Sequence, residues 1–219
     1  MEIARSAAAL FMRNGLRATR AEDIARAAGI APRTFYRYFA SKEEALGPLF
    51  AAGAQKWAEA VRDAPADLSV PEALRHAVKQ TLTPGVGVRR ESLEWVRSLI
   101  RLAETSPALL RVWGEACQTG ERTLARVLTV RVSGGEGRAE PDVSAASAPA
   151  EPDVSAASAP APIAVSPELR FGAAVASAAV RVAVEAWAAG DAAADGPEGP
   201  AELALRHLGA LRDFPWNAA

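Results

Sequence analysis

Helix boundaries crowd the first 46 residues of this chain and leave room there for little but short helices. A first helix stops at Asn14-Gly15, since glycine favours the left-handed backbone that ends helices. Thr19-Arg20-Ala21-Glu22 predicts a capping box at the start of a second helix, which ends at Gly29. Pro32 suits the first position of a third helix, over 33–39, because proline has no N–H to leave unpaired. We therefore expect three short helices, the last two joined by a three-residue turn.

The third of these helices would carry most of the chemistry. Phe35 and Phe39 lie four residues apart and would face inward, whereas Arg33 and Arg37 share the opposite face. Two helices joined by a tight turn are typical of the helix-turn-helix motif, whose second helix enters the DNA major groove. Arginine suits guanine, threonine suits a base edge, and tyrosine hydroxyls and lysine suit phosphates. The predicted DNA-contacting residues are Arg33, Thr34, Tyr36, Arg37, Tyr38 and Lys42.

Charge is distributed unevenly along the chain. The whole sequence has 25 Lys and Arg against 26 Asp and Glu, a formal net charge of −1. Residues 1–46 hold eight basic against five acidic side chains, and 17–42 hold six against two. A local basic excess is the electrostatic footprint of nucleic-acid binding. The alternative for Arg33 and Arg37 is an ordinary solvated helix face.

Together these residues resemble the N-terminal signature of the TetR/AcrR-type transcriptional regulators. The resemblance runs over 15–19, 23–25, 28–30, 34–39 and 41–43. It implies a homodimeric, all-helical protein whose first three helices bind operator DNA and whose C-terminal helices bind a small ligand that releases the DNA. By this resemblance, Thr34, Tyr36, Tyr38 and Lys42 match the usual DNA-contacting positions.

Two residues depart from the family pattern, and a second resemblance concerns the ligand. Ala31 replaces the Ser or Thr that often caps the recognition helix, at a cost of about 1 kcal/mol. Pro48 stands inside a helix predicted from Ser41 to about Arg62, and we expect it to kink or interrupt that helix. The recognition helix and 98–111 also resemble an actinobacterial branch of the family that includes the mycofactocin-system regulator. That resemblance implies an acyl-CoA-like effector.

The rest of the chain predicts more helices. Half of all residues are hydrophobic but only 6% are aromatic, and alanine, the strongest helix former, is abundant. Apolar periodicity predicts helices over 70–82, 90–104, 106–131, 167–189 and 200–213. We expect an all-α fold of about nine helices, with a DNA-binding domain over 1–46 and a ligand-binding and dimerisation domain over 47–219. Small residues in 167–189, together with 200–213, predict a homodimer interface, and hence an inverted-repeat operator.

An apolar effector would bind between helices of the C-terminal bundle, where ligand pockets of helical proteins lie. The candidate lining residues are Trp95, Leu99, Leu102, Trp113, Cys117 and Phe171. The same side chains could equally form an ordinary core, and the sequence leaves both possibilities open. Cys117 has no basic neighbour within a helical turn, which favours a buried structural thiol over a redox sensor.

A low-complexity segment interrupts the helices between 133 and 166. It contains a perfect tandem repeat of eleven residues, at 139–149 and again at 150–160. Its Ala, Ser, Pro, Gly and acidic composition cannot bury enough apolar surface to fold, so we predict a disordered linker. A repeat that binds a partner is the alternative.

Several classes of protein are disfavoured. The sequence shows no paired-carboxylate, nucleophile–base or phosphate-loop constellation, so we expect neither an enzyme nor a bound cofactor. His76 and His207 have no second metal ligand at helical spacing, so no metal site is expected. No signal sequence or uninterrupted apolar stretch of about 18 residues is visible, which predicts a cytoplasmic protein with no membrane partner. A DNA-binding dimer without a ligand remains the principal alternative to a ligand-released repressor, and a helical-bundle enzyme is disfavoured.

Overall fold

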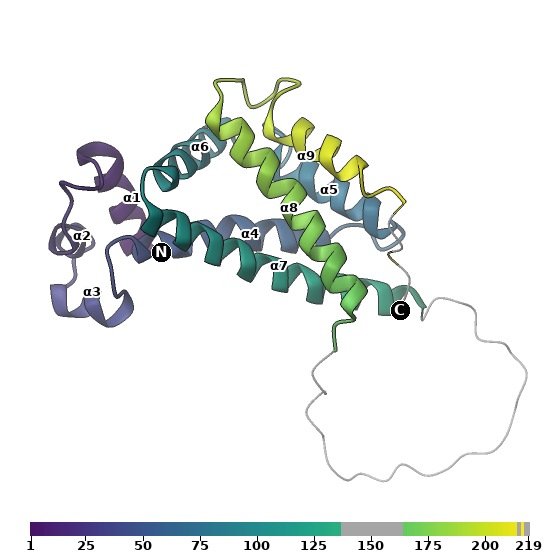
Figure 1. Cartoon of the computed structure of the whole chain (residues 1–219), viewed down its shortest axis with the longest axis horizontal. Coiled ribbons are helices and arrows are strands. Elements are labelled where there is room, and N and C mark those ends of the chain that lie inside the picture. The colour runs from purple at the N-terminus through teal and green to yellow at the C-terminus, as the bar shows by residue number, and fades with distance from the viewer. Residues whose placement is uncertain (137–163, 214–215, 217–219) are drawn as a thin grey trace, which may run out of the picture.

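The computed structural model describes residues 1–136, 164–213 and 216. Within these ranges the chain is all-helical, as predicted from the sequence. Its elements are α1 (Glu2–Asn14), α2 (Ala21–Ala27), α3 (Pro32–Tyr38), the 3₁₀ helix η1 (Glu44–Leu46), α4 (Gly47–Arg62), α5 (Val70–Leu82), α6 (Arg90–Glu104), α7 (Pro107–Glu136), α8 (Pro167–Ala189) and α9 (Pro200–Gly209). The first three helices form one end of the molecule, and α4 to α9 form a larger bundle beside them (Figure 1).

The turns between the N-terminal helices depend on two glycines. Gly15 follows α1 with a φ of 81°, and Gly29 follows α2 with a φ of 68°, both in the left-handed region. The predicted capping box at Thr19 and Glu22 is wrong by one residue. Arg20 is the N-cap of α2, and its backbone N–H donates to the Asp23 carboxylate over 3.1 Å. The Thr19 hydroxyl instead lies buried within the preceding turn.

Pro48 does not kink a helix, contrary to the sequence-based expectation. The segment predicted as one helix from Ser41 divides into η1 and α4, and α4 begins at Gly47. Pro48 therefore occupies the first turn of α4, where no backbone N–H is needed for the helical hydrogen-bond pattern. The chain continues from it as an uninterrupted helix to Arg62.

The later helix boundaries agree closely with the periodicity. The bounds of α5, α6 and α8 are those predicted, whereas α9 ends at Gly209 rather than at 213. Helix α7 extends to Glu136, so the first residues of the predicted linker are helical. Ser166, the last of that segment, caps α8 by accepting from the Leu169 N–H. The tandem repeat lies outside the described residues.

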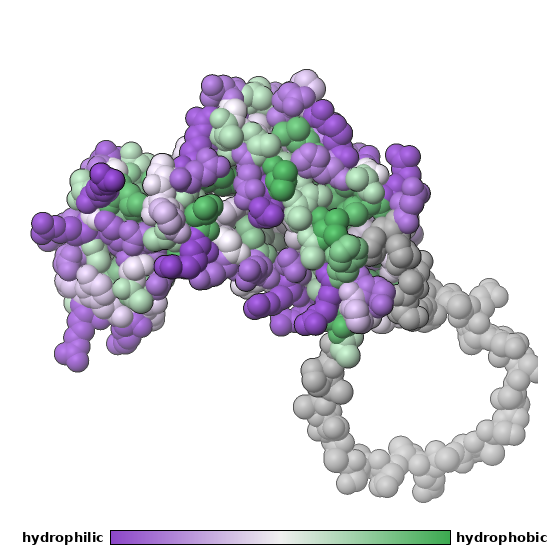
Figure 2. Space-filling view, viewed as in Figure 1, coloured by the Kyte–Doolittle hydropathy of each residue, from purple (hydrophilic) through white to green (hydrophobic). Residues whose placement is uncertain are grey.

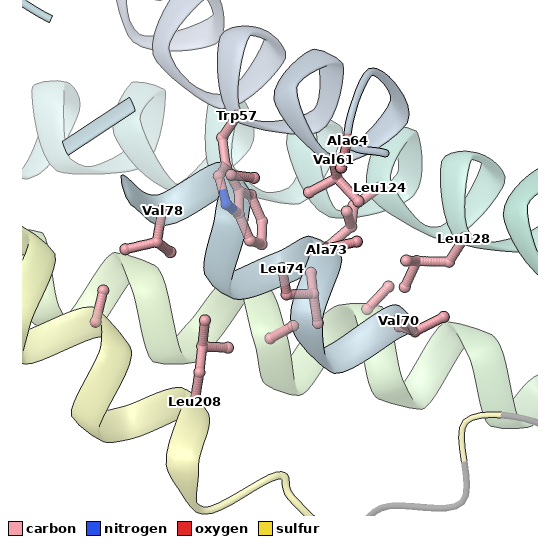
Figure 3. Packing of buried hydrophobic residues seen from close by; sticks show 14 of the residues in the cluster. Trp57, Val61, Ala64, Val70, Ala73, Leu74, Val78, Leu124, Leu128 and Leu208 are labelled. Carbon is pink, nitrogen blue, oxygen red and sulfur yellow. The ribbon is translucent and has the colours of Figure 1, made fainter. Parts of the chain in front are cut away.

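The larger bundle has its own hydrophobic core. Trp57 and Val61 of α4 lie with Leu74 of α5 and with Leu124 and Leu128 of α7, all of them nearly or completely buried (Figure 3). Small residues of α8 and α9 complete the same cluster and allow the helices to approach closely. A Cβ on Gly120 of α7 would lie only 2.5 Å from the Cβ of Ala54 of α4, so these two helices are in close backbone contact there.

A second hydrophobic core crosses the boundary predicted after Leu46. Phe11, Ile24 and Phe35 of the three N-terminal helices share one cluster with Phe50 of α4 and Leu99 of α6. All five side chains are less than 5% exposed. The three N-terminal helices therefore pack on the bundle through a continuous apolar interior rather than through a hinge.

One described helix, α8, is long and apolar enough by length and composition to cross a membrane. About half of its apolar stretch, 44%, is buried inside the molecule, and the core helix of a soluble protein meets the same criteria. Helix α8 packs against α6, α7 and α9.

Candidate DNA-binding surface

Helix α3 is anchored by one face and exposed on the other. Phe35 is fully buried, and its ring lies 5.3 Å from that of Phe39. Arg33, Tyr36 and Arg37 are exposed on the opposite side. Pro32 occupies the first turn as predicted, and the N-cap residue Ala31 makes no side-chain cap. The cluster that buries Phe35 therefore sets the direction in which the polar face of α3 points.

The predicted contact residues gather on this exposed face, with Lys42 as the exception. Tyr36 and Tyr38 are 51% and 61% exposed, and Thr34 is half-buried. The Arg37 guanidinium donates to the Tyr38 hydroxyl over 3.3 Å and lies 5.1 Å from the centre of its ring. A guanidinium stacked on an aromatic ring loses part of its rotational freedom, so Arg37 is partly ordered before any ligand binds.

Tyr36 has a partner on α2 that the sequence pattern did not indicate. Its hydroxyl donates a hydrogen bond of 3.2 Å to Oε1 of Glu22. The pKa of Tyr36 is raised from its ordinary value by desolvation, and further by the hydrogen bond to Glu22 and its negative charge. The phenol therefore stays protonated at neutral pH. Only the fold brings these residues, fourteen positions apart, into contact.

Lys42 is half-buried, and its ammonium faces the turn between α1 and α2. It donates to the carbonyl oxygens of Leu16 at 2.6 Å and Thr19 at 2.8 Å. An ammonium has three hydrogens, so one donor remains for an outside acceptor. Lys42 thus has a structural role in addition to its predicted contact with phosphate.

Hydrophilic side chains project from the end of the molecule formed by α2 and α3 (Figure 2). Arg17, Arg20 and Arg26 are exposed near Arg33 and Arg37 in the sequence. Arg26 pairs with Asp23 at 3.2 Å, which leaves the basic excess of this region in place. Arginine hydrogen bonds and positive charge are what phosphates and guanine edges accept.

The predicted ligand-lining residues lie in different parts of the structure. Trp95, Leu99 and Leu102 of α6 and Trp113 of α7 belong to the core shared with the N-terminal helices, and Leu99 is only 3% exposed. Phe171 lies apart on α8, with its side chain 61% exposed. These side chains are apolar, but their spacing in the sequence could not show which helices face each other.

Trp113 instead links three helices. Its indole N–H donates to the Glu185 carboxylate of α8 over 2.7 Å, and its ring meets that of Phe50 of α4 edge-on at 5.3 Å. Arg181 pairs with Glu185 at 3.0 Å. Cys117 lies near this pair, and burial raises the pKa of its thiol to about 12. A thiol that stays protonated at neutral pH is a poor nucleophile and a poor metal ligand.

A partly open groove of about 270 Å³ lies between α4 and α7. It is lined by Ala51, Ala52, Gln55, Ala116, Thr119, Gly120 and Thr123. None of the six predicted lining residues borders it. In the part of the chain that the structure describes, no group of three or more His, Cys, Asp or Glu side chains is placed to hold a metal ion.

Comparison with known proteins agrees with the N-terminal geometry. The family model for bacterial regulatory proteins of the tetR family matches residues 3–46. Over 136 residues the chain is 35% identical to the HTH-type transcriptional regulator TcmR of Streptomyces glaucescens. That match covers 59% of this chain and 58% of TcmR, so the chain spans little more than half the length of this relative.

Solved structures are similar in fold over most of the length of the chain. Thermus thermophilus FadR, a TetR-family transcriptional repressor in complex with lauroyl-CoA, is similar with a TM-score of 0.56 and 22% identity, over 96% of this chain and 91% of FadR. A putative TetR-family regulator from Mesorhizobium loti has a TM-score of 0.50 and 18% identity, over 98% of this chain and 93% of that one. Residues 3–46 therefore match the tetR family of bacterial regulatory proteins, and the fold of the chain is similar to that of these two TetR-family proteins.

Proposed function

We propose that this protein is a DNA-binding transcriptional repressor whose α3 enters the major groove of operator DNA. The observation that carries the proposal is the two-sided character of α3. Its inner face is fixed by the buried Phe35, and its outer face presents Arg33, Arg37 and two tyrosines. Residues 1–46 would form the DNA-binding domain, and 47–219 the domain for ligand binding and dimerisation. A cytoplasmic location follows from this function.

Dimerisation would pair α8 and α9 with the same helices of a second copy. Val182 of α8 is 45% exposed, and Val175 and Ala178 on the same side of the helix are partly exposed. Apolar side chains lie along the outward face of α8 (Figure 2). A two-fold dimer would present two copies of α3, which requires an inverted-repeat operator with matching half-site spacing.

Release from DNA would follow the binding of a small hydrophobic effector, for which an acyl-CoA-like compound is our candidate. FadR, which shares the fold, was crystallised with lauroyl-CoA. Trp95, Leu102 and Trp113 pack where the bundle meets the N-terminal helices, so a ligand that separated them would also move α1 and α3. The effector must bind the two conformations with different affinities, because only that difference can shift the equilibrium.

A DNA-binding dimer without an effector is the alternative, and one observation favours it. Leu99 is 3% exposed and lies in the apolar cluster that α6 shares with the N-terminal helices. A thermal-shift screen with acyl-CoAs of graded chain length distinguishes a ligand-released repressor from a dimer without an effector. A rise in melting temperature, together with loss of operator binding, supports the repressor, whereas no shift with any of them supports the alternative.

DNA binding itself is tested by selection from a pool of duplexes with a randomised central region. The full chain should enrich an inverted repeat, and sedimentation velocity should show a dimer on the selected duplex. Failure to enrich any sequence at physiological salt would contradict the proposal, because non-specific binding alone gives no enrichment.

A further inference from the structure

The hydrogen bond between Tyr36 and Glu22 joins the two helices of the helix-turn-helix motif on their exposed side. The Tyr36 hydroxyl lies 3.2 Å from Glu22 Oε1, and both side chains are exposed. The Tyr36 ring is held edge-on against the buried Phe35, with centroids 5.6 Å apart and an interplanar angle of 86°. Phe35 therefore limits the movement of the ring, and Glu22 limits the direction of the hydroxyl.

The chemistry of the two groups fixes the direction of this bond. A phenol has a single hydrogen to donate, and an ionised carboxylate only accepts. The Tyr36 proton therefore points to Glu22, and the lone pairs of its oxygen face outward. In this state Tyr36 offers an acceptor to DNA and no donor.

We propose that the Glu22–Tyr36 pair is a specificity element that selects a base with an exocyclic amino group. In the major groove only the N4 amino group of cytosine and the N6 amino group of adenine are donors. Phosphate oxygens, guanine O6 and N7, and thymine O4 are acceptors and cannot pair with an acceptor. Glu22 is the positioning residue, and its negative charge also disfavours a phosphate beside it. The inference rests on the proposed function, since it assigns a role to one contact within the same surface.

The test compares four forms of the full chain in the duplex selection: the unmodified chain, Glu22→Gln, Tyr36→Phe and the double variant. Glu43→Gln is the matched control, because it removes the same charge from the N-terminal region and leaves the pair intact. Thermal denaturation of each variant checks that the fold is retained.

The unmodified chain should prefer cytosine or adenine at one position of each half-site. Tyr36→Phe should reduce that preference by about three- to tenfold, the range for one hydrogen bond, without changing the other positions. Glu22→Gln should reduce the base preference at the same position. The double variant should lose no more of this preference than either single variant does. Glu43→Gln should change affinity equally for all sequences.

Two results would overturn the inference. An equal loss of affinity for every sequence in Tyr36→Phe would show a phosphate contact, and an unchanged base preference in Glu22→Gln would show that Glu22 does not direct the hydroxyl. Either result leaves DNA binding by α3 intact. Absence of any enriched sequence with the unmodified chain would instead overturn the proposed function, and this inference with it.

Discussion

The ammonium nitrogen of Lys42 lies 2.8 Å from the carbonyl oxygen of Thr19. Lys42 follows α3 in the sequence, and this hydrogen bond closes the turn that precedes α2. The Thr19 hydroxyl donates to the Gly15 carbonyl at 2.9 Å from within the same turn. Thr19 is only 1% exposed. The turn is therefore stabilised by the Thr19 hydroxyl and by the Lys42 ammonium. Because Lys42 follows α3, it also links the position of α2 to that of α3.

Replacing Lys42 with methionine should lower the stability of the protein. The substitution keeps much of the apolar stem but removes hydrogen bonds to Leu16 and Thr19, and a hydrogen bond to a charged group contributes about 1.5–3 kcal/mol. Urea denaturation followed by circular dichroism measures the change. Arg33→Met is the matched control: Arg33 is exposed, and we expect its loss to leave stability within about 0.5 kcal/mol. Equal stability of the two variants would show that the Lys42 hydrogen bonds contribute nothing.

Two glycines of α7 should respond in opposite ways to alanine. Gly120→Ala places a Cβ 2.5 Å from that of Ala54 and should destabilise by about 1–3 kcal/mol, the usual cost of overpacking. Gly114→Ala has open space around the new methyl group and should stabilise by up to about 1 kcal/mol through helix propensity. Thermal denaturation of both variants checks the sign. Stabilisation by both would show that α4 and α7 are not in close contact.

Local signals in the sequence predicted most helix boundaries, because prolines and capping residues act on their own neighbours. Gly15, for example, follows the end of α1 as predicted, and Pro32 lies in the first turn of α3. Pro48 was misjudged because the signal at Ser41 suggested an earlier helix start than the structure has. The cap predicted at Thr19 was misplaced by one residue because the Thr19 hydroxyl donates to the Leu10 carbonyl of α1 instead of capping α2.

The candidate site was only partly predictable. The exposed arginines and tyrosines of α3 follow from helical periodicity around Phe35. The contacts of Tyr36 with Glu22 and of Trp113 with Glu185 join residues 14 and 72 positions apart, and no periodicity encodes such pairs. The effector residues could not be chosen for the same reason, because an apolar stripe does not reveal which helix will cover it.

Acid should remove the contribution of the ion pair between Arg90 and Asp195. Two hydrogen bonds of 3.0 and 2.5 Å join these side chains, and they hold the pKa of Asp195 down at about 2. The pair stabilises the fold fully above the unfolded pKa of about 3.9 and loses this effect as pH falls towards 2. Asp195→Asn should therefore be less stable than the unmodified chain at pH 6, and the difference should shrink towards pH 2 and vanish below it. A constant difference in urea midpoint between these pH values would contradict the ion pair.

Cys117 should react slowly with thiol reagents in the folded protein. Burial raises the pKa of its thiol to about 12, so very little thiolate is present at pH 8. Labelling with a maleimide should be slow at pH 8 and should become fast in denaturant, where the thiol has an ordinary pKa of about 8.5. Equal rates in both conditions would contradict the partial burial of Cys117.

Binding of the selected duplex by arginine variants of α3 shows whether this helix enters the major groove. Fluorescence anisotropy measures the dissociation constant of Arg33→Ala, Arg37→Ala and the control Arg126→Ala, an exposed arginine on α7, over a range of salt concentrations. If α3 lies in the major groove, both α3 variants should bind more weakly, and each lost phosphate contact should reduce the slope of log K against log salt by about 0.9 per site. Arg33→Ala should also relax base preference, and Arg126→Ala should change nothing. Unchanged binding by both α3 variants would show that α3 does not contact the DNA.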